Sequence, residues 1–266
     1  MDGVNPTPSS SPGTPVRTFP ALLARLLRED PGRPLVTYYD DATGERTELS
    51  VVTYANWVSK NANLLLEELD VEPGDVVLLD LPAHWLVPVF LGAAWSIGAA
   101  VTTDPSVEHR VVVCGPDTVT TRAEDPDGAP VLACSLHPFA TRFAQPLPPG
   151  VTDNGSAWPG QGDVLVPPEP VGPDAPARVG ADATTTQGAL LDAARAEPLP
   201  GSGRLLTDRH PLAGPVDDAG HLVADLLAPF AQGGSLVLVR HADPSGWAGR
   251  AEQERVDVVR RADGGR

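Results

Sequence analysis

The chain of 266 residues is poor in several residue types, and each shortage excludes a class of protein. It has 19 basic residues against 35 acidic ones, so its formal net charge is −16, and Lys60 is the only lysine. Binding to nucleic acid needs a basic surface that neutralises phosphates, and anionic membrane surfaces attract basic segments in the same way. We therefore expect no nucleic-acid partner and no membrane partner.

Cysteine is also scarce. Cys114 and Cys134 are the only two cysteines, and each lies in a short apolar run, RVVVCG and VLACS. Free cysteine packs as a small hydrophobic residue, and neither a CxxC pair nor a Cys/His spacing typical of zinc sites occurs. We expect two buried thiols and no metal.

One segment resembles a membrane span in its lack of charge. Residues 81–103 contain no Asp, Glu, Lys or Arg, a length that could cross a bilayer. However, the segment contains Pro82, His84 and Pro88, and no basic flank follows it. A buried helix followed by a buried strand is favoured over a transmembrane helix. The N-terminus lacks the features of a signal peptide, so we expect a disordered tail at 1–16 and a cytoplasmic protein.

Patterns of helix and strand alternate along the first half of the chain. Thr18 and Ser50 are good N-caps for helices at 19–29 and 51–69, and a β-rich hairpin pattern lies between them at 34–49. An apolar strand pattern at 76–81, a helix pattern at 84–97 and two more strand patterns follow. This alternation predicts an α/β fold with largely parallel sheets flanked by helices.

Proline and glycine divide the chain. Residues 146–180 are rich in both, which disfavours regular structure there. Helix patterns return at 184–196 and 217–231, then a buried strand pattern at 235–240 and a charged terminal helix from 247. We predict a first α/β subdomain at 17–145, a Pro/Gly-rich connection at 146–180 and a second, incomplete α/β subdomain at 181–266.

Several short motifs occur in a fixed order along the chain. They are Glu48-Leu49, the run VEPGDVV at 71–77, Gly98-Ala99-Ala100 with Thr103-Asp104-Pro105, and Gln232-Gly233-Gly234 before the strand pattern at 235–239. This ordered set resembles the front part of the acyl-adenylate-forming (AMP-binding, acyl-CoA synthetase-like) superfamily. The whole chain also resembles a group of actinobacterial proteins of similar length. The resemblance implies the fold of the N-terminal subdomains of adenylate-forming enzymes.

The phosphate loop of that superfamily has no counterpart here. In the family, a loop rich in Ser, Thr and Gly carries a lysine, and both hold the phosphates of ATP. The corresponding residues 167–186 contain no lysine. The most similar sequence there, ATTTQG, resembles the start of the next helix. The family's later motifs and its C-terminal domain would lie beyond Arg266. No catalytic, cofactor-binding or metal-binding residue is carried over.

These observations favour a non-catalytic relative that binds a small acyl or nucleotide ligand, or a protein partner. The alternative is an enzyme: either half of an adenylating enzyme completed by a partner chain, or a hydrolase built on a polar cluster. That cluster comprises His210, Asp217, Asp218, His221 and Asp225. In a helix, 217, 221 and 225 share one face, where carboxylates could orient an imidazole or hold a metal. The competing interpretation is a capped helix with a solvated face.

Two further candidates are favoured as structural. His84 and Trp85 follow the first buried strand pattern, at a usual ligand location in α/β sheets, but a packing role fits them better. Asp125, Asp127 and Gly128 resemble a fragment of a calcium loop but lack the other ligands, so we expect a turn.

Overall fold

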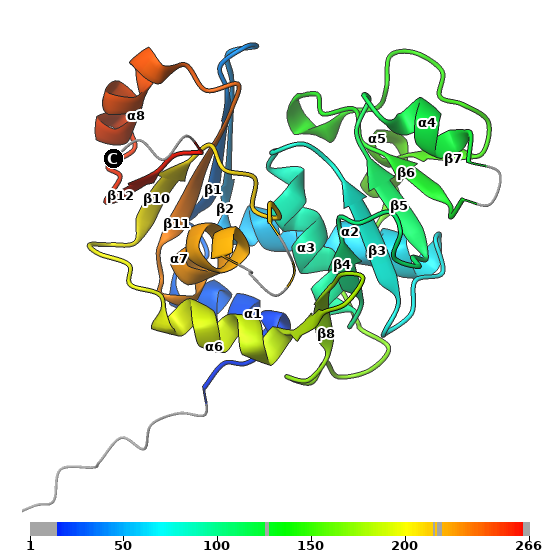
Figure 1. Cartoon of the computed structure of the whole chain (residues 1–266), viewed down its shortest axis with the longest axis horizontal. Helices are drawn as coiled ribbons and strands as arrows, with labels where there is room; N and C mark the ends of the chain where they lie inside the picture. The colour runs from blue at the N-terminus through cyan, green and yellow to red at the C-terminus, as the bar shows by residue number, and fades with distance from the viewer. Residues whose placement is uncertain (1–14, 126–127, 215, 217–219, 263–266) are drawn as a thin grey trace, which may run out of the picture.

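The computed structural model describes residues 15–125, 128–214, 216 and 220–262, which form two sheets with helices between and around them (Figure 1). The first sheet has the order β12-β10-β11-β1-β2, and only the β1–β2 pair is antiparallel. Its strands are β1 (Pro34–Asp40), β2 (Glu45–Ser50), β10 (Arg204–Thr207), β11 (Ser235–Arg240) and β12 (Val258–Arg260).

The second sheet has the order β7-β6-β5-β3-β4-β8-β9, and only the β8–β9 pair is antiparallel. Its strands are β3 (Val76–Asp80), β4 (Ala100–Thr102), β5 (Val111–Cys114), β6 (Val131–Ala133), β7 (Val151–Asp153), β8 (Pro176–Val179) and β9 (Thr184–Thr186). The fold is therefore α/β with largely parallel sheets, which confirms the prediction.

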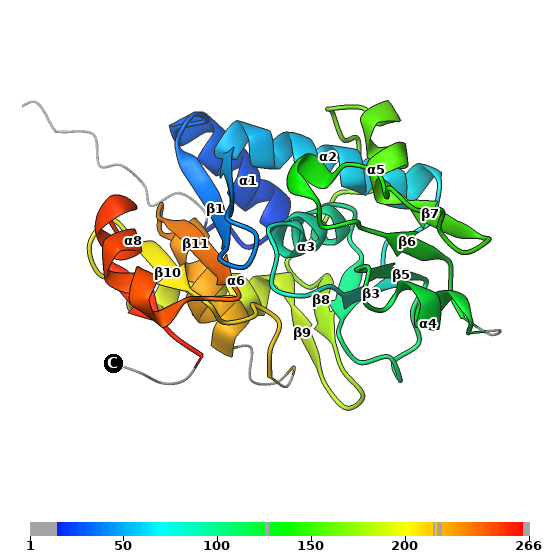
Figure 2. The ribbon, with the colours of Figure 1, turned by 90° about the horizontal axis from the view of Figure 1, so that it is seen from above.

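The main hydrophobic core lies between the two sheets, as Figures 1 and 2 show. The helical segments that fill this space are α1 (Phe19–Glu29), α2 (Val51–Glu67), α3 (Leu86–Ser96), α6 (Gln187–Ala196), a π-helical turn (Leu222–Leu227) and α7 (Ala228–Ala231). Smaller clusters cover the outer faces, where α4 (Val119–Ala123) packs on the second sheet and α8 (Trp247–Gln253) on the first. The short helix α5 (Asn154–Ala157) follows β7.

The predicted caps form. The side chain of Thr18 accepts a hydrogen bond from Ala21 N at 3.4 Å, and that of Ser50 accepts one from Thr53 N at 3.2 Å. Each satisfies a backbone donor that the first turn of a helix leaves free. The hairpin at 34–49 is also confirmed as β1 and β2.

The uncharged segment 81–103 forms the centre of the core. Every residue of α3 is buried, so this helix needs apolar or small side chains all around. A Cβ at Gly92 would lie 2.8 Å from both Tyr54 Oη and Val58 Cγ2, so glycine allows α2 and α3 to approach closely. Among the described residues, no helix has the length and hydropathy needed to cross a bilayer.

One predicted helix differs from the structure, and a second contains a π-helical turn. The terminal helix ends at Gln253: Arg255 takes a left-handed φ of 51°, and Val258 starts β12 beside β10. The β-branched run around Val256 and Val258 favours a strand over a helix. Within 217–231, the described residues from 220 onward are helical, with a π-helical turn at their centre.

The predicted division into subdomains stays a prediction. The boundaries of the two sheets along the chain differ from the boundaries of the predicted subdomains. Strands β1 and β2 fall in the range 17–145 and yet join β10, β11 and β12. Strand β7 lies within the Pro/Gly-rich connection and extends the second sheet.

Candidate functional site

An open cleft of about 370 Å³ lies where β4 and β8 end. It is lined by Thr102, Thr103, Asp104, Arg178, Gly180, Ala181, Asp182, Ala183, Gly214 and Val216. Ligands of α/β proteins bind outside the carboxyl ends of parallel strands, and ligand pockets have volumes of about 300–1,000 Å³. Its place at these strand ends makes this cleft, here called the hairpin cleft, the candidate functional site, and its volume lies within the range of ligand pockets.

Arg178 builds one wall of the hairpin cleft. Its side chain is buried, with 1% of the residue exposed, and Nη2 donates hydrogen bonds to Leu212 O at 2.8 Å and Gly214 O at 2.6 Å. Thr185 Oγ1 donates to Val216 O at 3.2 Å. These bonds hold the described residues of segment 208–216, which follow β10 of the first sheet, against the second sheet. The cleft therefore has walls from both sheets.

The loop between β8 and β9, residues 180–183, forms a further part of the wall. Gly180 N donates to Ala183 O at 2.8 Å, which closes the short loop 180–183. That loop carries an exposed carboxylate, Asp182, and no basic side chain. Thr186 then caps α6 by accepting from Ala189 N at 3.2 Å. The run ATTTQG therefore forms β9 and the start of α6, and the loop 180–183 offers no cation to the phosphates of a nucleotide.

A second carboxylate faces the hairpin cleft. Asp104 Oδ1 accepts hydrogen bonds from Ser106 Oγ at 2.7 Å and from Ser106 N at 2.9 Å, and these bonds lower the pKa of Asp104. The side chain stays ionised at neutral pH. Because Arg178 already donates to backbone carbonyls, the exposed charges of the cleft are negative and disfavour a triphosphate.

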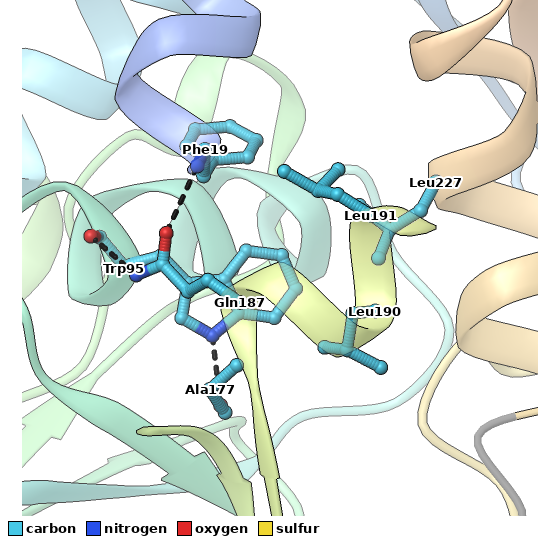
Figure 3. A pocket seen from close by; sticks show the side chains of 7 residues that line it. All are labelled: Phe19, Trp95, Ala177, Gln187, Leu190, Leu191 and Leu227. Carbon is cyan, nitrogen blue, oxygen red and sulfur yellow. Dashed lines mark hydrogen bonds between the residues drawn. The ribbon is translucent and has the colours of Figure 1, made fainter. Parts of the chain in front are cut away.

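A small apolar pocket lies deeper, between α1, α3 and α6 (Figure 3). Gln187 closes it: Oε1 accepts from Phe19 N and Nε2 donates to Trp95 O, both at 2.9 Å. Trp95 Nε1 donates to Ala177 O at 2.7 Å. The pocket has a volume of about 10 Å³, about that needed for one water molecule. It is a packing defect with satisfied polar walls and cannot hold a larger ligand.

The predicted polar cluster does not form one catalytic site in the described residues. His210 Nε2 donates to Leu81 O at 2.9 Å, and Nδ1 accepts from Leu212 N at 3.1 Å. Burial lowers the pKa of His210, so the imidazole is neutral and both nitrogens are occupied. Its role is to fasten segment 208–216 to the end of β3.

Asp225 belongs to a different contact. Its side chain is fully buried, and Oδ1 accepts from Arg260 Nη1 at 3.1 Å, while Arg260 also pairs with Glu197 at 2.9 Å. Burial raises the pKa of Asp225 against the opposing effect of Arg260. His221 precedes it by one turn, with Nδ1 unpartnered among the described residues. Asp217 and Asp218 lie outside the described residues, and within the rest no group of His, Cys, Asp and Glu could hold a metal.

The remaining candidates make packing and turn contacts. His84 is fully buried and accepts from Leu86 N through Nδ1 at 3.2 Å; burial lowers its pKa to about 3. Asp125 accepts from Gly128 N in a turn, and Asp127 lies outside the described residues. Cys114 and Cys134 are buried free thiols.

Arg178 is the main feature that the sequence did not reveal. It occupies a short strand after a proline-rich segment, and nothing in the run PARVG distinguishes it from a surface arginine. Its importance comes from segment 208–216, which the fold brings from the other sheet.

The arrangement of two largely parallel sheets around a helical core is the acyl-CoA synthetase-like fold. An acyl-CoA synthetase from Brucella canis superposes with a TM-score of 0.74 at 17% identity, covering 95% of this chain and 48% of that protein. A fatty acyl-CoA synthetase from Mycobacterium tuberculosis gives 0.68 at 13%, covering 91% and 49%. An anthranilate CoA ligase, solved with anthranoyl-AMP, gives 0.70 at 12%, covering 92% and 50%. The chain spans about half the length of these structures.

No protein-family model matches the chain. A TIGR03089 family protein from Mycobacterium tuberculosis (strain ATCC 25618 / H37Rv) is 39% identical over 253 residues, which are 92% of this chain and 99% of that protein. The chain therefore belongs to the TIGR03089 family.

Proposed function

We propose that the protein is a non-catalytic relative of the acyl-adenylate-forming enzymes that binds a small ligand in the hairpin cleft. One observation carries the proposal: the hairpin that precedes α6 has the loop 180–183, with Asp182 and without lysine or arginine. A loop that holds ATP must offer donors and positive charge to the phosphates.

The charge of the cleft favours an acyl compound over ATP. Asp104 and Asp182 would repel a triphosphate, while an uncharged acyl chain or amide would meet no such repulsion. The cleft is large enough for a small organic molecule. A bound acyl-adenylate in the anthranilate CoA ligase shows that one protein of this fold holds such a ligand, and a nucleoside monophosphate is the second class to test.

A thermal-shift screen against ATP–Mg, AMP, CoA and small acyl compounds tests the binding part. A ligand at 100 times its Kd stabilises the folded state by about 2.7 kcal/mol. Ala181→Trp places a large side chain in the hairpin cleft and should abolish the shift. Ala144→Trp, on an exposed residue outside the cleft, is the matched control and should leave it unchanged.

Pyrophosphate exchange with ATP and the same acids tests the non-catalytic part. We expect no exchange with the chain alone. Exchange would instead identify an active enzyme, and exchange only after a second protein is added would identify a half-enzyme completed by a partner. The net charge of −16 further supports the absence of a nucleic-acid or membrane partner.

A further inference from the structure

Another open cleft, of about 400 Å³, lies at the end of the first sheet where its parallel strands begin. The residues that line it come from the starts of β1, β10 and β11, from β2 and from the end of α8. They include Arg33, Arg204 and Arg255, so the cleft is here called the arginine cleft. Its volume lies within the range of ligand pockets. It shares no lining residue with the hairpin cleft.

Arg33 carries a charge that no described residue neutralises by an ion pair. Its Nη1 donates to Gly234 O at 2.6 Å, while its Nη2 has no hydrogen-bond partner among the described residues. Burial lowers the pKa of Arg33, against the opposing charges of Asp30 and Glu29. A guanidinium that is partly removed from water is stabilised by an anion close to it.

Arg255 is the second arginine of the cleft without an ion pair to a described residue, and its side chain is exposed. Its backbone has a left-handed φ of 51° just after α8, a position where glycine is the usual residue. Arg255 N donates to Glu252 O at 3.1 Å, and Val256 N donates to Ala251 O at 2.9 Å, so this conformation closes the helix. Strained residues concentrate at ligand sites, which favours a role for the arginine side chain.

The carboxylates that line the arginine cleft are already paired. Glu48 accepts from Arg46 Nη2 at 2.6 Å, and Glu254 accepts from the same nitrogen at 3.0 Å and from Arg204. Arg204 Nη1 also donates to Ser235 Oγ at 2.9 Å. The charge of Arg204 is therefore used within this network. The two arginines without ion pairs leave the cleft with positive charge, in a chain whose formal net charge is −16.

We propose that the arginine cleft is a second binding site, which takes a small molecule that bears an oxyanion, either a carboxylate or a phosphate group. A guanidinium presents a planar fork of N–H donors that matches two oxygens of either group. The local positive charge attracts such a ligand from solution. The proposal does not rest on the function of the hairpin cleft, which lies beside the other sheet.

NMR titration of the full chain with inorganic phosphate, and separately with acetate, tests the site at constant ionic strength. The backbone amide signals of Ser202, Gly234 and Arg255 should shift and saturate, while that of Ala181 in the hairpin cleft should stay unchanged. Comparison of the two anions distinguishes a phosphate group from a carboxylate group, because the matching anion binds more tightly. If neither anion gives saturable shifts at the arginine cleft, the proposal is wrong.

Arg255→Gly is the most informative substitution. Glycine suits the left-handed backbone, so the variant should be at least as stable as the wild type without ligand. Loss of the charged donors should raise the Kd for the tighter-binding anion about tenfold. Arg255→Lys keeps the charge without the fork, so its Kd should rise less. Arg142→Ala removes an exposed arginine outside the cleft and without an ion pair to a described residue, and should leave the Kd unchanged.

Two outcomes with these variants would overturn the site. Wild-type affinity in Arg255→Gly would show that the arginine does not contact the anion, and an equal loss in Arg142→Ala would show a general effect of charge. Ala181→Trp, which fills the hairpin cleft, should bind the anion like the wild type. Loss of anion binding in that variant would place the anion in the hairpin cleft instead, so failure of the second site and failure of the proposed function remain distinguishable.

Discussion

The charged side chains of the two sheets are used in different ways. At the first sheet, the Glu254 side chain is 6% exposed and accepts from Arg46, at 3.0 Å, and from Arg204 and Tyr39. This network fastens the end of α8 to β1 and β10. At the hairpin cleft of the second sheet, Asp104 and Asp182 face solvent. The comparison teaches that the first sheet uses carboxylates to hold the fold together, while the second leaves carboxylates accessible to a ligand.

Removing the centre of the first-sheet network should have the largest effect. Glu254→Ala leaves Arg204 and Arg46 without their shared carboxylate, and breaking a buried pair costs about 3–5 kcal/mol. We expect the free energy of unfolding, measured by urea denaturation, to fall by that order. Asp104→Ala in the hairpin cleft is the matched carboxylate control and should change it by less than about 0.5 kcal/mol. Equal losses in the two variants would remove the distinction between the sheets.

Arg178→Met should have the next largest effect. Hydrogen bonds to charged groups contribute about 1.5–3 kcal/mol, and methionine fills a similar volume without donors. We expect a loss of about 2 kcal/mol in urea denaturation, with faster proteolysis within 208–216. Arg209→Met, whose guanidinium donates to Arg261 O near the surface, serves as control. An unchanged cleavage pattern would show that segment 208–216 does not depend on Arg178.

The same network predicts a pH dependence. Burial opposes ionisation of Glu254, but hydrogen bonds from Tyr39, Arg204 and Arg46 outweigh it and lower its pKa below the ordinary 4.5. The lowered pKa contributes stability that is present above pH 4.5 and is lost as the pH falls through the folded-state value. Urea denaturation between pH 6 and pH 3 should therefore show a smaller acid loss in Glu254→Gln than in the wild type. Parallel curves would contradict the pKa shift.

The smallest effect concerns the cysteines. Cys114 is the last residue of β5, and Cys134 directly follows the neighbouring strand β6. Their side chains nevertheless belong to different hydrophobic clusters, on opposite faces of the sheet. Burial raises the pKa of Cys114 to about 12. We expect no reaction with a thiol reagent in the native state at pH 8 and two reactive thiols in urea. Rapid labelling of the native protein would show that the core opens easily.

Local elements of this fold follow from the sequence, and contacts between distant segments do not. The caps Thr18 and Ser50, the hairpin at 34–49 and the buried helix α3 were predictable because their signals lie within a few residues. Strand β12 was not predicted: its β-branched residues favour a strand, but the run VDVVRR is short, and the strand forms only where β10 offers its free edge. The hairpin cleft was missed because segment 208–216 comes from a different sheet.

The contacts of the candidate site residues also depend on segments that are distant in the sequence. Sequence spacing placed His221 and Asp225 on one helical face, but the buried position of Asp225 and its pairing with Arg260 depend on the packing of β12. The left-handed backbone of Leu136, Phe139 and Ala140 carries no sequence signal either, since none of them is glycine.

The parallel pairing of β1 with β11 has a consequence for how the chain acquires its structure. Val36 lies beside Leu236, so the two partners are 200 residues apart in the sequence (236 − 36). During synthesis, hairpin β1–β2 leaves the ribosome long before its neighbour exists, and the strands of the second sheet can pair in the meantime. Closing so long a loop is slow, so we expect the first sheet to complete last. Until then, the edge of β1 that pairs with β11 in the folded protein is exposed to other nascent chains.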